Sequence, residues 1–90
     1  MTRIRKNKSE LHLETLCKRL NIEHSKRGYP DFTIYKDGEI FGFIEVKPNH
    51  GKELKREQKS FERFCKRMKI PFMKWTPEDG EEAILKLWTQ

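Results

Sequence analysis

Two acidic residues and one lysine, Asp31, Glu45 and Lys47, stand at the outer ends of two adjacent runs of residues with strand-like character. Carboxylates that lie side by side repel each other unless a proton or a cation lies between them. Oxygen ligands of this kind suit Mg²⁺ or Mn²⁺, which keep bound water and also take phosphate oxygens. Such an ion can acidify a bound water, and a neighbouring lysine can orient that water or stabilise developing charge. The three residues therefore predict metal-dependent hydrolysis of a phosphodiester, although a Glu-x-Lys triplet alone fits an ordinary polar strand end equally well.

The connection between the two runs decides whether these side chains share a face of the sheet. The runs, residues 31–35 and 39–47, read as the antiparallel strands of a β-hairpin. A two-residue Asp-Gly turn would put Asp31 and Glu45 on opposite faces, because side chains alternate along a strand. A three-residue loop closed by Gly38 would put them on one face. Both turns are chemically acceptable, and we expect the three-residue loop because it assembles the site.

The same register sorts the apolar residues of the hairpin by face. It pairs Tyr35 with Glu39 and places Asp31 opposite Phe43. The face away from the site then carries Phe32, Ile34, Ile40, Ile44 and Val46. Phe41 and Phe43 would lie on the site face, where they either pack under a helix or contact a second subunit.

Two predicted helices bring further polar groups toward the hairpin. In the helix expected over residues 52–68, Gln58 falls inside an apolar stripe. That stripe consists of Leu54, Phe61, Phe64, Cys65 and Met68. An unsatisfied buried amide costs roughly 1–3 kcal/mol, so Gln58 is expected to reach a metal-bound water or a phosphate; a half-exposed residue at the helix start is the alternative. In the helix expected over residues 9–20, Glu10 is better placed than Glu14 to face the sheet, although the helix dipole explains an N-terminal glutamate equally well.

The rest of the chain completes an α/β order. The first helix begins at Ser9, a preferred N-cap, and carries Leu13, Leu16, Cys17 and Leu20 at helical spacing. A short strand within residues 22–29 precedes the hairpin, a strand over residues 72–76 follows the second helix, and a short helix closes the chain. The order α-β-β-β-α-β with a short C-terminal helix predicts one α/β domain over residues 1–90, a mixed sheet flanked by helices.

The charge balance favours a polyanionic partner. Twenty Lys and Arg against fourteen Asp and Glu give a net charge of +6, and residues 1–8 read as a mobile basic arm. The residues expected to contact phosphate are Arg3, Arg5, Lys6, Lys8, Arg27, Lys52, Lys55 and Lys59. A solvated helix face is the alternative for any single lysine.

No apolar stretch approaches the ~20 residues that span a bilayer, and no secretory signal is recognisable, so no membrane is expected. Cys17 and Cys65 are predicted to be reduced core residues.

The ordered set Gly28-Tyr29-Pro30-Asp31, Glu45-Val46-Lys47 and a helical Gln58 resembles the PD-(D/E)xK nuclease superfamily. More narrowly, it is similar to the virus-type replication-repair nuclease (VRR-Nuc) group, from Glu10 to about Thr76. The resemblance implies a restriction-endonuclease-like core with Mg²⁺ or Mn²⁺ as the cofactor and no small-molecule cofactor. It also implies the metal ligands Glu10, Asp31, Glu45 and the backbone carbonyl of Val46, with Lys47 as the catalytic lysine and Gln58 behind the site.

The resemblance further implies a structure-specific DNA endonuclease, similar to the Holliday-junction resolvases of phages and bacteria that work as homodimers on four-way junctions. Resolving such a junction needs two paired cuts, which suits a small subunit with one site. A cytoplasmic location, in a bacterial cell or a phage-infected host, goes with this expectation. Two alternatives stay open: a non-catalytic basic nucleic-acid-binding module, and a restriction or defence nuclease of the same fold.

Overall fold

The computed structural model describes residues 8–26 and 31–89. Its elements in chain order are α1 (Lys8–Arg19), β1 (Glu23–Ser25), β2 (Phe32–Lys36), β3 (Glu39–Val46), α2 (Arg56–Met68), β4 (Phe72–Trp75) and α3 (Gly80–Trp88). The predicted order of helices and strands is confirmed. Lys8, which was expected in a mobile arm, opens α1, and Ser9 is buried inside that helix rather than preceding it as a cap. Arg3, Arg5, Lys6, Arg27 and the Gly28-Tyr29-Pro30 segment lie outside the described residues.

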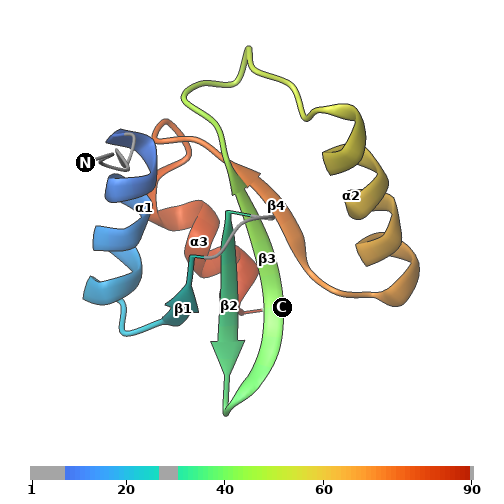
Figure 1. Cartoon of the computed structure of the whole chain (residues 1–90). Helices are drawn as coiled ribbons and strands as arrows, with labels where there is room; N and C mark the ends of the chain where they lie inside the picture. Colours follow the sequence, from blue (N-terminus) through green and yellow to red (C-terminus); the bar gives the residue numbers. More distant parts are fainter. Residues whose placement is uncertain (1–7, 27–30, 90) are drawn as a thin grey trace, which may run out of the picture.

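The sheet has the strand order β1-β2-β3-β4 and is mixed, as predicted. The pairs β1–β2 and β2–β3 are antiparallel, whereas β4 runs parallel to β3. A parallel neighbour needs a crossover connection, and α2 supplies it. Helices α1 and α3 lie on one side of the sheet and α2 lies on the other (Figure 1). No helix within residues 8–26 and 31–89 is long and apolar enough to cross a membrane.

The main core fills the space between the sheet and the pair α1 and α3. It consists of Leu13, Leu16, Cys17, Ile22, Phe32, Ile34, Ile44, Val46, Trp75, Ile84 and Leu87. Four of the five hairpin residues predicted to face inward belong to this cluster. Both cysteines are free and buried, as expected. Burial and the charge of Glu14 raise the pKa of Cys17 to about 11, so this thiol stays neutral at physiological pH.

The predicted three-residue loop of the hairpin is wrong. Lys36 pairs with Glu39 around a two-residue turn in which Asp37 and Gly38 both have positive φ, 53° and 81°. This is the geometry that Asp-Gly favours in a tight hairpin, because its twist matches that of the strands. Such a turn alone would separate Asp31 from Glu45 across the sheet, but a second irregularity lies further along the strands.

A β-bulge in β3 reverses the alternation of side chains. Tyr35 pairs with Ile40 and Ile34 pairs with Gly42, so Phe41 is an extra residue without an opposite partner. The register then continues to Phe32 opposite Ile44, and its extension places Asp31 opposite Glu45. The two acids therefore share a face by a different route from the predicted one.

The bulge also overturns two of the predicted side-chain orientations. Ile40 was expected in the core and is 58% exposed, since it lies on the turn side of the extra residue. Phe41 was expected on the site face, but its ring lies 5.2 Å from that of Trp88 in α3, on the core side. Phe43 remains on the site face, with its ring 5.0 Å from that of Phe61 in α2.

Helix α2 begins at Arg56, four residues later than predicted. Residues 52–55 form an irregular connection instead, where the Lys74 ammonium group donates a hydrogen bond to the Lys52 carbonyl oxygen at 3.0 Å. The apolar stripe of α2 is only partly covered: Cys65 is buried, whereas Phe64 and Met68 are 45% and 56% exposed. This helix packs on a narrow strip of the sheet and leaves part of its apolar surface outside.

Candidate active site

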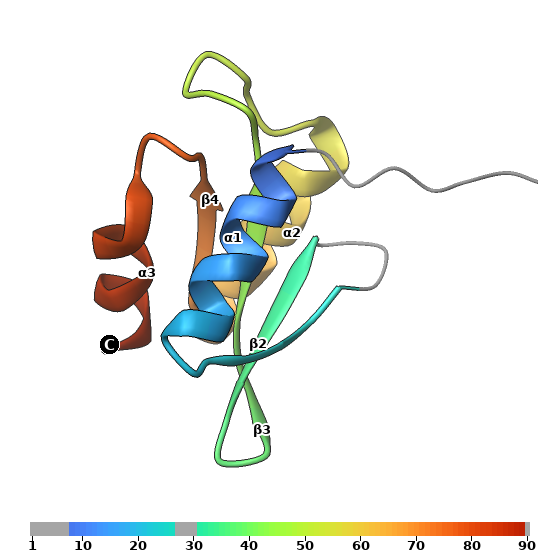
Figure 2. The ribbon, with the colours of Figure 1, turned by 90° about the vertical axis from the view of Figure 1, so that its left-hand side faces the viewer.

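The candidate site lies where β3 ends beside the beginning of β2. In Figures 1 and 2 β2 begins near mid-height next to β3, and the starts of α1 and α2 lie higher, on either side of the sheet. Asp31 comes immediately before β2, and the Glu45-Val46-Lys47 segment closes β3. The hairpin and the crossover helix thus bring together residues that are separated by up to 27 positions along the chain, from Asp31 to Gln58.

Asp31 and Glu45 are joined through reciprocal contacts with each other's strand. The Val46 backbone N–H donates to Asp31 Oδ2 at 3.0 Å, and the Asp31 backbone N–H donates to Glu45 Oε1 at 3.4 Å. These contacts hold both carboxylates on the α2 side of the sheet, where Phe43 also lies. The Val46 side chain points into the core on the opposite side and is 6% exposed, so only its backbone takes part here.

The Glu45 carboxyl group is the most perturbed acid of the site. Its residue is 3% exposed. Burial first, and then the charge of Asp31, raise the pKa of Glu45 from 4.5 to about 7, and the nearby Lys47 only partly opposes the shift. A buried carboxyl group beside a second acidic side chain is a place where a cation would be stabilised.

The raised pKa predicts that the metal-free protein loses stability as the pH rises. Between pH 4.5 and about 7 the folded state binds more protons at Glu45 than the unfolded state, so the free energy of unfolding falls over this range. Allowing for solvent screening, we expect a loss of about 1–2 kcal/mol. Chemical denaturation in EDTA at pH 5 and pH 8 measures it. Glu45→Gln should remove this pH dependence, whereas Glu39→Gln, at an exposed position of the same strand, should keep it; equal pH profiles for Glu45→Gln and wild type would contradict the assignment.

Gln58 is buried, as predicted, and its side-chain amide contacts two groups of the protein. Its Oε1 accepts a hydrogen bond from the Lys55 backbone N–H at 2.6 Å, which caps the start of α2. Its Nε2 donates to Glu45 Oε2. Because the helix cap occupies the amide oxygen, the amide nitrogen is directed to the carboxylate. Gln58 therefore positions Glu45 and also explains why α2 starts at Arg56.

Lys47 brings an ammonium group to the two acids. Its Nζ lies 3.9 Å from Glu45 Oε2, and its side chain is 13% exposed. Its backbone N–H donates to the Trp75 carbonyl oxygen at 2.9 Å, which fixes the end of β3 to the parallel strand β4. The lysine is thus held at the rim of the site, beside a carboxylate and still accessible to solvent.

The two glutamates of α1 have different surroundings. Glu14 Oε1 lies 3.6 Å from the Lys26 ammonium nitrogen, and both side chains are largely buried, 16% and 18% exposed. Glu14 is therefore engaged on the β1 side of the helix. Glu10 lies in the first turn of α1 and is half-buried. Its position at the start of α1 makes it the better candidate of the two for the site.

The acidic ligands that these elements supply are few. Within residues 8–26 and 31–89, no group of three or more His, Cys, Asp and Glu is arranged to hold a metal ion. Two adjacent carboxylates nevertheless fit Mg²⁺ or Mn²⁺, since such ions are held by one or two carboxylates and complete their shell with water and phosphate oxygens. Asp31 and Glu45 supply two such carboxylates, and the backbone carbonyl oxygen of Val46, the residue after Glu45, is a further oxygen donor.

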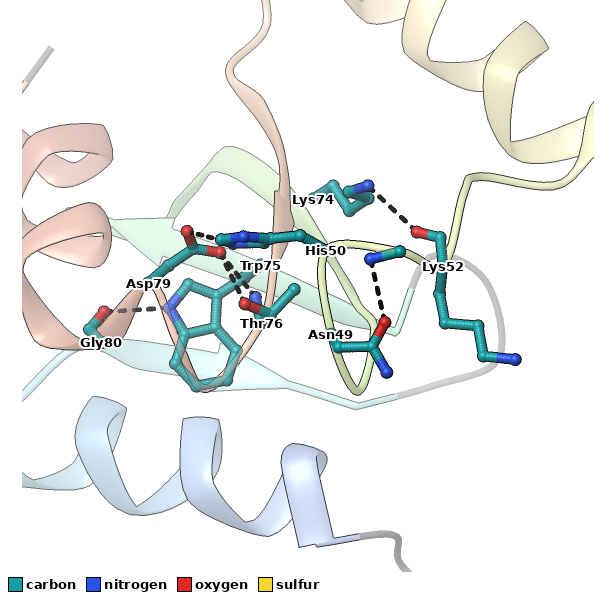
Figure 3. A network of polar contacts seen from close by, with 9 residues as sticks. Asn49, His50, Lys52, Lys74, Trp75, Thr76, Asp79 and Gly80 are labelled. Atoms are coloured by element: carbon teal, nitrogen blue, oxygen red, sulfur yellow. Dashed lines mark hydrogen bonds and ion pairs between the residues drawn. The ribbon is translucent and has the colours of Figure 1, made fainter.

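A second polar network, which was not predicted from the sequence, holds the loop that follows β3 in place (Figure 3). His50 Nε2 lies 2.8 Å from Asp79 Oδ1, and Asp79 Oδ2 accepts hydrogen bonds from the backbone N–H and hydroxyl of Thr76 at 2.8 and 3.1 Å. Partial burial alone would raise the pKa of Asp79, but the hydrogen bonds from Thr76 and His50 outweigh it and lower this pKa. The network joins the loop after Lys47 to the turn between β4 and α3.

The lysines predicted to contact DNA, where they are described, lie on the surface. Lys52, Lys55 and Lys59 are exposed and surround the start of α2, close to the buried Gln58. Lys74 was missed by the sequence interpretation. It pairs with Glu45 in the sheet register, and only knowledge of the parallel β3–β4 pairing could have placed it there.

Comparison of the chain with protein-family models, with curated proteins and with solved structures gives no match.

Proposed function

We propose that this chain is a metal-dependent endonuclease that hydrolyses phosphodiester bonds of DNA, with a restriction-endonuclease-like core. The observation that carries the proposal is the convergence of Asp31, Glu45 and Lys47 on one face of two adjoining strands, with the two acids linked through 3.0 and 3.4 Å contacts. The order α-β-β-β-α-β around a mixed sheet supports the same proposal. A lone Glu-x-Lys strand end would not explain why the buried Gln58 is directed at Glu45.

The proposed cofactor is Mg²⁺ or Mn²⁺. Asp31, Glu45 and the Val46 carbonyl oxygen are the groups that would hold it, with Glu10 as a further acidic residue at the same end of the molecule. When bound, such an ion supplies an acidified water and neutralises negative charge on the phosphate.

The protein's own residues have separate tasks in this proposal. Asp31 and Glu45 provide negative charge at a fixed position, because the backbone of β3 and the Gln58 amide hold their carboxylates. Lys47 orients the attacking water or stabilises charge on the phosphate through its ammonium group. Gln58 is a positioning residue, since it acts through Glu45. The exposed lysines around the start of α2 supply attraction for the DNA backbone.

The proposed substrate is branched DNA, a four-way junction above all, and the proposed active form is a homodimer. The exposed Phe64 and Met68 of α2 support a second subunit, since exposed apolar surface is a common feature of subunit interfaces. A junction cut by one dimer receives two paired incisions, one from each site.

The experiment that tests this function combines cleavage with metal binding. We expect the wild-type protein to cut a labelled four-way junction in Mn²⁺ by paired incisions, and to bind Mn²⁺ in calorimetric titration. Asp31→Asn should weaken Mn²⁺ binding by at least about tenfold and abolish cutting. Asp37→Asn is the matched control, because Asn is favoured at this positive-φ turn position. If the wild type binds DNA but neither binds Mn²⁺ nor cuts, the chain is a non-catalytic binding module; preference for linear duplex of one sequence would identify a restriction or defence nuclease.

A further inference from the structure

A groove runs between α2 and β4, on the face of the sheet that α2 covers. It consists of two adjoining hollows, of about 310 and 370 Å³, that share Glu62 and Arg63. The first is lined by Glu53, Leu54, Lys59, Glu62, Arg63 and Lys74. The second is lined by Glu62, Arg63, Lys66, Ile70 and Phe72. We call the two together the α2–β4 groove.

The groove occupies one flank of α2 and the exposed apolar residues occupy another. At about 100° per residue, Lys59, Arg63 and Lys66 fall on one side of the direction in which Gln58 faces the sheet. Phe64 and Met68 fall on the opposite side. A partner subunit seated on the apolar flank would thus leave the basic flank open.

The cations of the groove are not neutralised within the protein. Within residues 8–26 and 31–89, no ion pair involves a charged side chain of α2 or Lys74. Lys74 donates to a backbone carbonyl oxygen and Arg63 donates to the Ser60 hydroxyl, and both of these acceptors are uncharged. Four cations against Glu53 and Glu62 leave the lining positive.

The groove begins beside the candidate active site. Lys74 is the sheet neighbour of Glu45, and Lys59 follows Gln58 in α2. From there the second hollow continues toward Phe72, at the far end of β4. A DNA strand that leaves the site along this seam would meet the four cations in succession.

We propose that the α2–β4 groove binds an unpaired DNA strand adjoining the scissile position. The inference rests on the proposed function in taking DNA as the polyanion and the Asp31, Glu45 and Lys47 site as the place of cutting. A duplex presents phosphates but hides its base faces, so it would leave the apolar lining of Leu54, Ile70 and Phe72 uncovered. A single strand presents both, because its phosphates meet the cations while its bases cover the apolar lining. The substrate class that fits the groove is therefore branched DNA with a single-stranded arm, which widens the proposed substrates beyond four-way junctions with fully paired arms.

The test measures DNA binding in EDTA, where no metal-dependent cutting can occur. The probes are an oligothymidine of about 12 nucleotides and a blunt duplex of the same length. For Arg63→Gln/Lys66→Gln we expect at least about tenfold weaker binding of the oligothymidine, and a decrease of about 1.4 in the slope of log affinity against log salt. Duplex binding should change by less than about threefold. Lys74→Gln should weaken oligothymidine binding in the same direction.

The matched control is Lys18→Gln/Lys86→Gln, which removes two exposed lysines from α1 and α3 and changes the net charge equally. It should bind both probes as the wild type does, and circular dichroism should show that all variants are folded. Equal weakening of both probes by the groove variant, or an unchanged oligothymidine affinity, would overturn the inference. In either case Mn²⁺-dependent cutting of a junction by the wild type would leave the proposed function standing, and its absence would count against the function separately.

Discussion

Replacing Lys47 by alanine is expected to lower the rate of junction cleavage by about 10²–10³-fold while the protein still binds Mn²⁺. The Lys47 ammonium group lies 3.9 Å from Glu45 Oε2 at the rim of the site, where it can act on water or phosphate but cannot be a metal ligand. The variant therefore separates catalysis from metal binding. Single-turnover cleavage with saturating enzyme measures the first, and calorimetric titration with Mn²⁺ measures the second.

Lys52→Ala provides the control for this result. The Lys52 side chain is exposed, and its backbone makes the contacts with the fold: the N–H donates to the Asn49 carbonyl oxygen at 3.2 Å, and the carbonyl oxygen accepts from Lys74. Its loss should weaken DNA binding in a salt-dependent way and leave the single-turnover rate at saturation nearly unchanged. If Lys47→Ala cleaved at the wild-type rate, or if both variants behaved alike, Lys47 would have no role beyond its positive charge.

Replacing Gly42 by valine is expected to destabilise the protein by about 3 kcal/mol, the upper part of the range for overpacked positions. A Cβ atom at this position would lie 2.8 Å from the Pro71 carbonyl oxygen and 3.0 Å from Pro71 Cβ. Backbone atoms cannot move aside there, because the Phe43 backbone N–H donates to the same Pro71 oxygen at 2.9 Å. Denaturant unfolding, followed by circular dichroism, gives the free energy of unfolding.

Gly38→Ala distinguishes steric blockage from backbone strain. Gly38 has φ +81°, and nothing lies within 4 Å of an added Cβ, so alanine there should cost only about 1–2 kcal/mol, from its left-handed conformation. A Gly42→Val protein as stable as Gly38→Ala would show that β3 and the Pro71 segment can separate more easily than the structure indicates.

Much of the fold follows from the alternation and turn signals of the sequence. The seven elements, their order and the hairpin were predicted from apolar spacing and from the Gly and Pro positions, whereas the parallel pairing of β4 and the crossover role of α2 were not. The hairpin register was not predicted. It depends on the turn length and on the bulge, which have opposite effects on the face that each side chain occupies. Asp37 and Gly38 favour a two-residue turn, and the extra residue at Phe41 cancels its effect on the faces. Gly42, next to Phe41, is a local signal, because an isolated glycine in a strand often accompanies a bulge or a close approach of backbone; it does not show which residue is the extra one.

The sequence predicted which residues form the candidate site, but it did not predict all of their contacts. Asp31, Glu45, Lys47 and Gln58 meet, but Gln58 holds the helix start and the Glu45 carboxylate together. This dual use goes with the start of α2 at Arg56, which the periodicity of residues 52–68 could not reveal. Lys74 and the His50–Asp79 pair depend on contacts between β4 and the loop after β3, which are distant in sequence.

Because of the additional residue of β3, the arrangement of the candidate site depends on the number of residues in the strand as well as on their chemistry. If the extra residue of β3 were lost, with the turn and the pairing beyond it kept, each acid would still be present, yet they would emerge from opposite surfaces of the sheet. Chains that share this site are therefore expected to vary the length of the paired part of β3 only by even numbers, whereas the turn itself is free to lengthen. The parity of a short stretch of backbone thus constrains this molecule as firmly as the identity of its acids.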